Sequence, residues 1–227
     1  MATENPIAPQ PGAAIKLQIL STEHWSLLAT RSLTYSESFT RVSMFLSVMS
    51  GAVIALALIA QADRFGKTFI LIAILLLSVV LFVGVATIGR LMDLNRDDIR
   101  WVIGMNRLRH AYVQLNPEVQ DYFVASPYDD LRGVWKTLGI EVMPGRGLPS
   151  AFHGLQTLPG MLTVIVAAVA GAIGALAALA FAFGQVAVVM ATAAAFLTAL
   201  ISLGFWGSRS FGRYAAGLDT RYPPPPS

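Results

Sequence analysis

Charged residues are missing from three long stretches of this chain, and these stretches set its predicted fold. No charged residue occurs over the 21 positions from Val42 to Ala62 or over the 22 positions from Thr68 to Gly89. In the third stretch, 147–208, the only ionisable side chain is His153. A helix needs about 20 mostly apolar residues to cross a bilayer. The first two stretches therefore supply one membrane span each, and the third is long enough for two.

The third stretch divides at its most polar point, Gly184 and Gln185. The pattern predicts an all-α polytopic membrane protein in which four transmembrane helices form two hairpins, with a helical cytoplasmic middle segment and an amphipathic N-terminal helix. The expected segments are a disordered N-terminal arm (1–14), a cytoplasmic or interfacial amphipathic helix (15–41), transmembrane hairpin 1 (42–89, with spans 42–61 and 69–89), a cytoplasmic helical segment (90–159), transmembrane hairpin 2 (160–207, with spans 160–183 and 186–207) and a cytoplasmic tail (208–227).

Large apolar residues follow one face of the predicted N-terminal helix. Such a stripe beside a span is typical of a helix at the level of the lipid headgroups, and equally of one packed on the middle segment. Three polar residues lie off the stripe, and we expect His24, Arg31 and Glu37 to be solvated surface. The members of the stripe are Trp25, Leu28, Tyr35, Phe39 and Val42.

The second span is expected to continue as a helix beyond Gly89, because no proline occurs before Pro117. Residues on one face of this helix recur at alternate steps of three and four, and all are apolar or aromatic except Asp98. We call this row the 91–115 seam and expect it to pack within the chain. Its members are Leu91, Leu94, Asp98, Trp101, Met105, Leu108, Tyr112 and Leu115.

Turn and cap signals predict two short helices further on. Asn116 before Pro117 indicates the start of one, and Ser126 before Pro127 indicates a second that ends at Gly139. The tail ends in Tyr222 and four prolines, and we expect it to be extended and disordered.

Fourteen of the sixteen Lys and Arg residues lie in the region before the first span (1–41), the middle segment and the tail, and the other two lie in the loop 61–68. Because cytoplasmic loops of membrane proteins carry the excess of Lys and Arg, both termini and the middle are expected in the cytoplasm. The membrane would be the plasma membrane, or the inner membrane of a bacterium. Arg90, Arg96 and Arg100 are expected to contact anionic headgroups. This topology explains the net charge of +3, so we expect no nucleic-acid partner.

Small residues recur at steps of four in several spans, which allows close helix packing in lipid. Two such rows lie on the third span, and we expect one to pack within the chain and the other against another subunit. Span four repeats the step with Ala191, Ala195 and Ala199. The candidate packing and oligomerisation residues are Gly51, Ala167, Ala170, Gly171, Gly174, Ala175 and Ala178.

The residues that carry chemistry are sparse. Cysteine is absent, no ionisable residue lies inside a span, and no zinc, nucleotide or nucleophile-elbow motif occurs. We therefore expect no catalytic, metal or cofactor site, and no enzyme. The hydroxyls within the spans are expected to bond to their own helices.

The leading hypothesis is a non-enzymatic integral membrane protein that self-associates or acts as a subunit or scaffold of a membrane complex. Its expected partners are the lipid bilayer and further copies of itself or other membrane subunits. The alternative hypothesis is an oligomeric passive channel, whose wall could consist of hydroxyls, backbone and apolar side chains.

Overall fold

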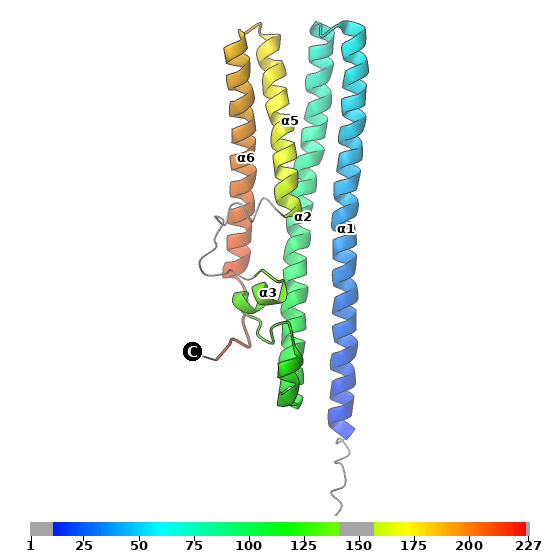
Figure 1. Ribbon diagram of the computed structural model, residues 1–227, viewed down its shortest axis with the longest axis vertical. Coiled ribbons are helices and arrows are strands. Elements are labelled where there is room, and N and C mark those ends of the chain that lie inside the picture. Colours follow the sequence, from blue (N-terminus) through cyan, green and yellow to red (C-terminus); the bar gives the residue numbers. More distant parts are fainter. Residues whose placement is uncertain (1–10, 141–156, 226–227) are drawn as a thin grey trace, which may run out of the picture. The chain divides into compact units, whose positions relative to one another are not determined.

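The computed structural model describes residues 11–140 and 157–225 (Figure 1). In these ranges every regular element is a helix, and no strand occurs. The first ten residues of the expected arm and most of the loop before the third span lie outside the described residues. The elements are α1 (Pro11–Asp63), α2 (Lys67–Leu115), the 3₁₀-helix η1 (Pro117–Tyr122), α3 (Leu131–Thr137), α5 (Leu158–Ala180) and α6 (Gln185–Ala216).

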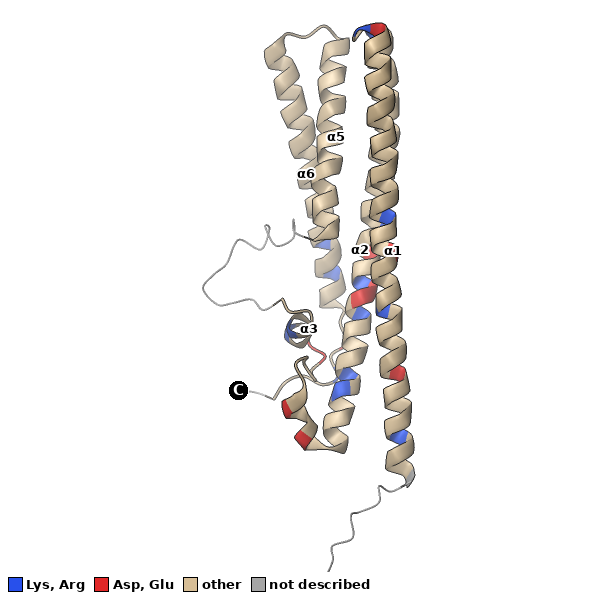
Figure 2. Cartoon of the chain, turned by 45° about the vertical axis from the view of Figure 1, so that its right-hand side comes forward, with Lys and Arg blue, Asp and Glu red and all other residues tan. Residues whose placement is uncertain are grey.

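Four of these helices, α1, α2, α5 and α6, are long and apolar enough to cross a membrane. The mean hydropathy of their most apolar stretches is 2.3, 3.2, 2.5 and 2.3. Long parts of all four carry no charged residue, as Figure 2 shows. The expected all-helical, multi-pass membrane class is therefore confirmed.

The helices run further than the predicted spans. The expected amphipathic helix and the first span form a single helix, α1, because no proline or glycine-rich break separates them. As expected, α2 continues past Gly89, and it ends at Leu115, two residues before Pro117. Helix α6 extends beyond Gly207 to Ala216.

The chain divides into two compact units. One comprises residues 36–96 and 143–216, and we call it the apolar unit. The other comprises residues 1–35, 97–142 and 217–227, and we call it the polar unit.

The core of the apolar unit is built from all four long helices. Apolar side chains fill it, and van der Waals packing between helices is what stabilises such a core where lipid surrounds it. As expected, hydroxyls in this unit bond to their own helices: Thr163 donates to Pro159 O at 2.8 Å and Thr192 to Val188 O at 2.8 Å. The buried core residues are Phe45, Ala52, Leu77, Val80, Ile88, Leu91, Leu94, Leu162, Val166, Val169 and Leu203.

In the polar unit, side chains cap the short helices. Asn116 Oδ1 accepts a hydrogen bond from Glu118 N at 3.1 Å, so the predicted start of η1 is confirmed. The next helix begins later than predicted, because Asp130 is the residue that caps it, accepting from Gly133 N at 3.0 Å. Gly139 follows this helix with a φ of 70°, a value that favours glycine.

Candidate functional site

The small-residue rows of α5 pack against α6. A Cβ atom added to Gly171 would lie 3.3 Å from both Phe196 Cβ and Thr192 O. One added to Gly174 would lie 2.8 Å from Ala191 O and from Ala195 Cβ. Each row thus contributes a glycine that lets the two backbones approach closely, and both glycines do so within the chain.

The other predicted packing residues divide into buried and open positions. Ala167 and Ala178 are buried, and Ala170 and Ala175 are half-buried. Gly51 of α1 is exposed, and nothing lies within 4 Å of a Cβ built on it. The structure therefore uses the small residues of α5 internally and leaves the small face of α1 open.

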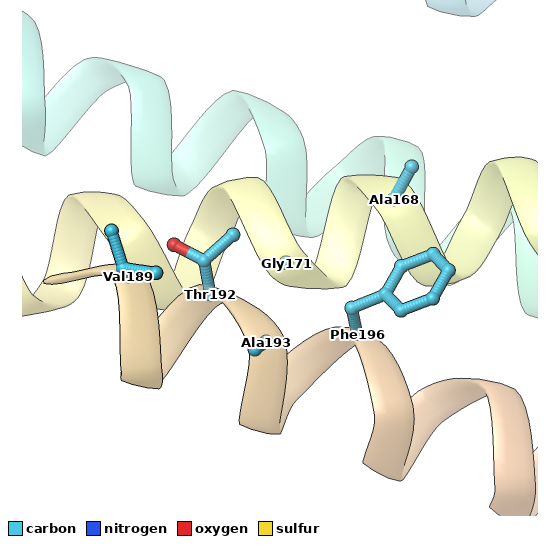
Figure 3. Close-up of a pocket in the computed structure, with 6 residues that line it drawn as sticks. All are labelled: Ala168, Gly171, Val189, Thr192, Ala193 and Phe196. Carbon is cyan, nitrogen blue, oxygen red and sulfur yellow. The ribbon is translucent and has the colours of Figure 1, made fainter.

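A shallow apolar groove of about 420 Å³ runs between α5 and α6 (Figure 3). The only polar side chain in its lining, Thr192, donates its hydroxyl hydrogen to its own helix. A ligand in this groove would therefore find apolar surface to pack against, but no side chain with a free hydrogen-bond donor. Its lining residues are Ala168, Gly171, Val189, Thr192, Ala193 and Phe196.

Gly84 is a packing residue that the sequence reasoning missed. A Cβ there would lie 2.5 Å from Val166 Cγ2 and 3.0 Å from Phe45 Cε2, so α1, α2 and α5 converge on this glycine. No small residue lies four positions away from it, since Val80 and Ile88 occupy those sites. The only available signal was a lone glycine in a span of bulky residues.

An ion pair joins α1 to α2 in the polar unit and corrects the expectation that Arg31 is solvated surface. Arg31 Nε lies 2.6 Å from Asp98 Oδ1, and the side chains are only 19% and 11% exposed. The Tyr35 hydroxyl lies 3.3 Å from Asp98 Oδ2 and 3.1 Å from Arg31 Nη2. Burial by itself lowers the pKa of Arg31, but the hydrogen bond and charge of Asp98, with Tyr35, outweigh it and raise that pKa. The polar residue of the 91–115 seam thus makes a specific contact.

The other two polar residues off the predicted stripe also have partners. The ring of His24 stacks on Tyr112, with centroids 5.9 Å apart, and burial followed by the charge of Arg109 lowers its pKa. The expectation of solvated surface was wrong for Arg31 and His24, whose partners come from α2, far away in the sequence. Glu37 stays partly exposed, with one partner on α1, Arg41, and one on α2, Arg90.

The apolar stripe of α1 is mostly open and not packed on the middle segment, although the Tyr35 hydroxyl bonds to Asp98 there. Trp25 is 69% exposed and Phe39 is 58% exposed. The face of α1 that meets α2 within the polar unit carries Leu27 and Arg31 instead, and a Cβ on Gly104 would lie 3.0 Å from Leu27 Cδ1.

The three arginines predicted to contact headgroups each hold an acidic partner. Arg90 pairs with Glu37, with 3.0 Å between nitrogen and oxygen, Arg96 with Asp93 at 3.0 Å, and Arg100 with Asp97 at 3.0 Å. Arg96 also donates to Ser210 Oγ of α6 within the apolar unit. Any headgroup contact would therefore compete with an ion pair already formed.

A second polar cluster centres on Asp129, whose side chain is fully buried. Its carboxylate accepts hydrogen bonds from Arg107 Nε at 2.7 Å and from the backbone N–H groups of Arg221 at 3.0 Å and Tyr222 at 2.8 Å. The Tyr222 ring stacks on His110 with centroids 4.2 Å apart. The expectation of a disordered tail was wrong for these residues, because a buried acceptor pairs with their backbone.

Asn106, the residue before Arg107 on α2, contacts the segment that carries Asp129. It is completely buried, and its side chain donates to Tyr128 O at 2.8 Å and accepts from Thr137 Oγ1 at 2.8 Å. The segment that carries Asp129 is therefore fixed against α2. Sequence reasoning assigned Asp129 only to a helix start, and a lone acid gives no signal of a partner about 90 residues away.

Replacing Asp129 with asparagine is expected to release the tail. Burial raises the pKa of the Asp129 carboxyl, but hydrogen bonds from Arg221 N, Arg107 and Tyr222 N together lower it below its usual value. A carboxyl with a lowered pKa stabilises the fold above its ordinary pKa, about 4, and this stabilisation is lost as the pH falls through the lower, folded value. A dye on a cysteine at Thr220 reports tail docking by anisotropy. We expect the wild-type tail to detach only below about pH 4, and the Asp129→Asn tail to be detached at every pH. Equal anisotropy of the two proteins at pH 7 would contradict this assignment.

A further hollow of about 730 Å³ lies in the polar unit between the start of α1 and the end of α2, with Leu17, Leu115 and Phe123 among its lining residues. No acid or base lines it. Over residues 11–140 and 157–225, no three His, Asp or Glu side chains come together as metal ligands. The described part of the chain thus offers helix-packing surfaces as its candidate site.

No protein-family model, curated protein or solved structure gives a significant match to this chain.

Proposed function

We propose that this chain is a non-enzymatic integral membrane protein that self-associates or serves as a subunit of a membrane complex. The observation that supports it best is the open surface of α1: Trp25 and Phe39 are 69% and 58% exposed, and, at another position around the helix, nothing lies within 4 Å of a Cβ built on Gly51. Exposed large apolar residues outside a bilayer mark an interaction surface. Inside a bilayer, small residues allow the backbones of two helices to approach closely and pack.

In this proposal α1 with α2 and α5 with α6 form two transmembrane hairpins, and both termini and the middle segment are cytoplasmic. The charge distribution supports this orientation, with fourteen Lys and Arg residues on one side and two on the other. Among the described residues, the buried side chains of the apolar unit are apolar except for the hydroxyls of Ser38, Thr163 and Ser210. An oligomeric channel would therefore need a lining shared between copies.

Two measurements test the proposal. A cysteine at Lys67 should be labelled from outside the cell, and this exposed position suits the probe better than Gly66, where a Cβ would lie 2.8 Å from Asp63 Oδ2. Protein extracted directly into native nanodiscs should have the mass of an assembly. Labelling of the Lys67→Cys protein only after permeabilisation would overturn the orientation, and a lone monomer in nanodiscs would overturn the assembly. Ion flux through vesicles containing the protein would favour the channel.

A further inference from the structure

Five residues of α1 form a continuous outward row, which we call the outer seam. Their positions follow alternate steps of three and four, the spacing of the a and d positions in a coiled coil. The apolar members are 42–69% exposed, and Ser32 is exposed as well. The outer seam consists of Trp25, Leu28, Ser32, Tyr35 and Phe39.

The seam lies on a different face of α1 from the contacts with α2. At 3.6 residues per turn it is displaced by roughly a third of a turn from Leu27 and Arg31. The Tyr35 hydroxyl reaches back to Asp98 and Arg31, and the Arg31 guanidinium lies 5.4 Å from the centre of the Tyr35 ring, while Tyr35 as a whole remains 44% exposed. A second helix can therefore pack on the seam without disturbing the Arg31 ion pair.

Lipid does not account for the whole seam, given the proposed membrane insertion on which this inference rests. Trp25 precedes Val42 by 17 residues on one uninterrupted helix, a length of about 25 Å at 1.5 Å per residue. The headgroup layer of one leaflet is only about 5–8 Å thick. Phe39 can lie in this layer, but Trp25 and Leu28 lie beyond it, where contiguous exposed apolar residues indicate a protein interaction surface.

We propose that the partner is α1 of a second copy of this chain, paired parallel and in register through the outer seam. Two copies inserted in the same orientation present α1 in the same direction, which makes the pair parallel. Each seam residue then faces its own counterpart, and none of them is charged.

The residues that flank the seam also permit self-pairing. Ala29, Ser36 and Ser38 are uncharged, and the one charged neighbour, Arg31, is held by Asp98. Like charges therefore do not meet across the pair, whereas a basic or acidic partner would find no complement.

Disulfide trapping tests the pairing directly, because the chain contains no cysteine. Ser32→Cys places a thiol in the seam, and Ser26→Cys is the matched control, an exposed serine roughly 120° away around the helix. Both are oxidised in native membrane vesicles and run on non-reducing gels. We expect on the order of tenfold more covalent dimer for Ser32→Cys, since a disulfide needs Cα atoms within about 7 Å.

A second pair of variants removes the seam instead of trapping it. Trp25→Ser combined with Leu28→Ser should shift the nanodisc mass toward the monomer, while Leu33→Ser, which removes an equally exposed residue off the seam, should not. Equal trapping of both cysteines, or a mixed disulfide with another protein, would overturn the pairing. If either result is found while the wild type still has the mass of an assembly, the proposed function stands and only the assignment of the outer seam as the interface is wrong. A monomeric wild type would overturn both.

Discussion

Replacing Gly84 with leucine is expected to destabilise the apolar unit more than any other single change of glycine. The new side chain would meet Val166 and Phe45, both fully buried, from two other helices. Neither can move aside, since Val166 is stiff at χ1 and Phe45 is enclosed in the core. Overpacking of this kind costs about 3 kcal/mol, and more where the backbone must shift.

Gly204→Leu is the matched control, because nothing lies within 4 Å of a Cβ at this exposed position of α6. It should leave stability unchanged or raise it slightly, because leucine favours a helix over glycine by up to about 1 kcal/mol. Thermal unfolding in mild detergent, followed by circular dichroism, compares the two. A similar fall in both midpoints would show that Gly84 is not a convergence point.

Breaking the Arg31–Asp98 pair is expected to loosen the polar unit. Asp98→Leu leaves the Arg31 guanidinium without its counter-charge, and Tyr35 loses its contact with the carboxylate. Losing one partner of a fully buried pair costs about 3–5 kcal/mol. Because both side chains here retain some contact with water, we expect about 2–3 kcal/mol.

The double variant Arg31→Leu with Asp98→Leu distinguishes the cost of an unpaired charge from the cost of changing the side chains at these two positions. With both charges gone, no charged group is left unpaired, the Tyr35 hydroxyl can bond to water because this residue is 44% exposed, and two apolar side chains can pack in their place, so most of the stability should return. Hydrogen exchange of peptides covering 20–35 and 97–112 measures the effect locally. If hydrogen exchange in the double variant were as fast as in Asp98→Leu, the lost packing of the two native side chains, and not an unpaired charge, would explain the effect.

The long helices could be predicted from the sequence because their signals are local. Uncharged runs located all four apolar helices, and Asn116 before Pro117 located a helix start. The close approach of α5 and α6 was foreseeable at Gly171 and Gly174 because small residues recur there at regular steps.

The remaining contacts join residues that are far apart, and one sequence does not show which distant partner each finds. Arg31 and Asp98 are 67 positions apart, so Arg31 has the same local pattern as a surface arginine. The aromatic stripe was recognised, but its direction was not, because the face of α1 that packs on α2 in the polar unit mixes apolar Leu27 with charged Arg31. Gly84 lacked a small neighbour at four positions, and so the small-residue pattern did not include it.

The contact of Asp129 with the tail has a consequence for the order of folding. It joins Asp129 to residues 92 and 93 positions further along, and both α5 and α6 lie between them. Closing so long a loop costs chain entropy that only later contacts can offset. The backbone groups that bind Asp129 are synthesised only after α5 and α6. Docking of the tail therefore requires that both helices have already been made, and a molecule that stops short of Arg221 leaves a buried carboxylate with only Arg107 to neutralise it.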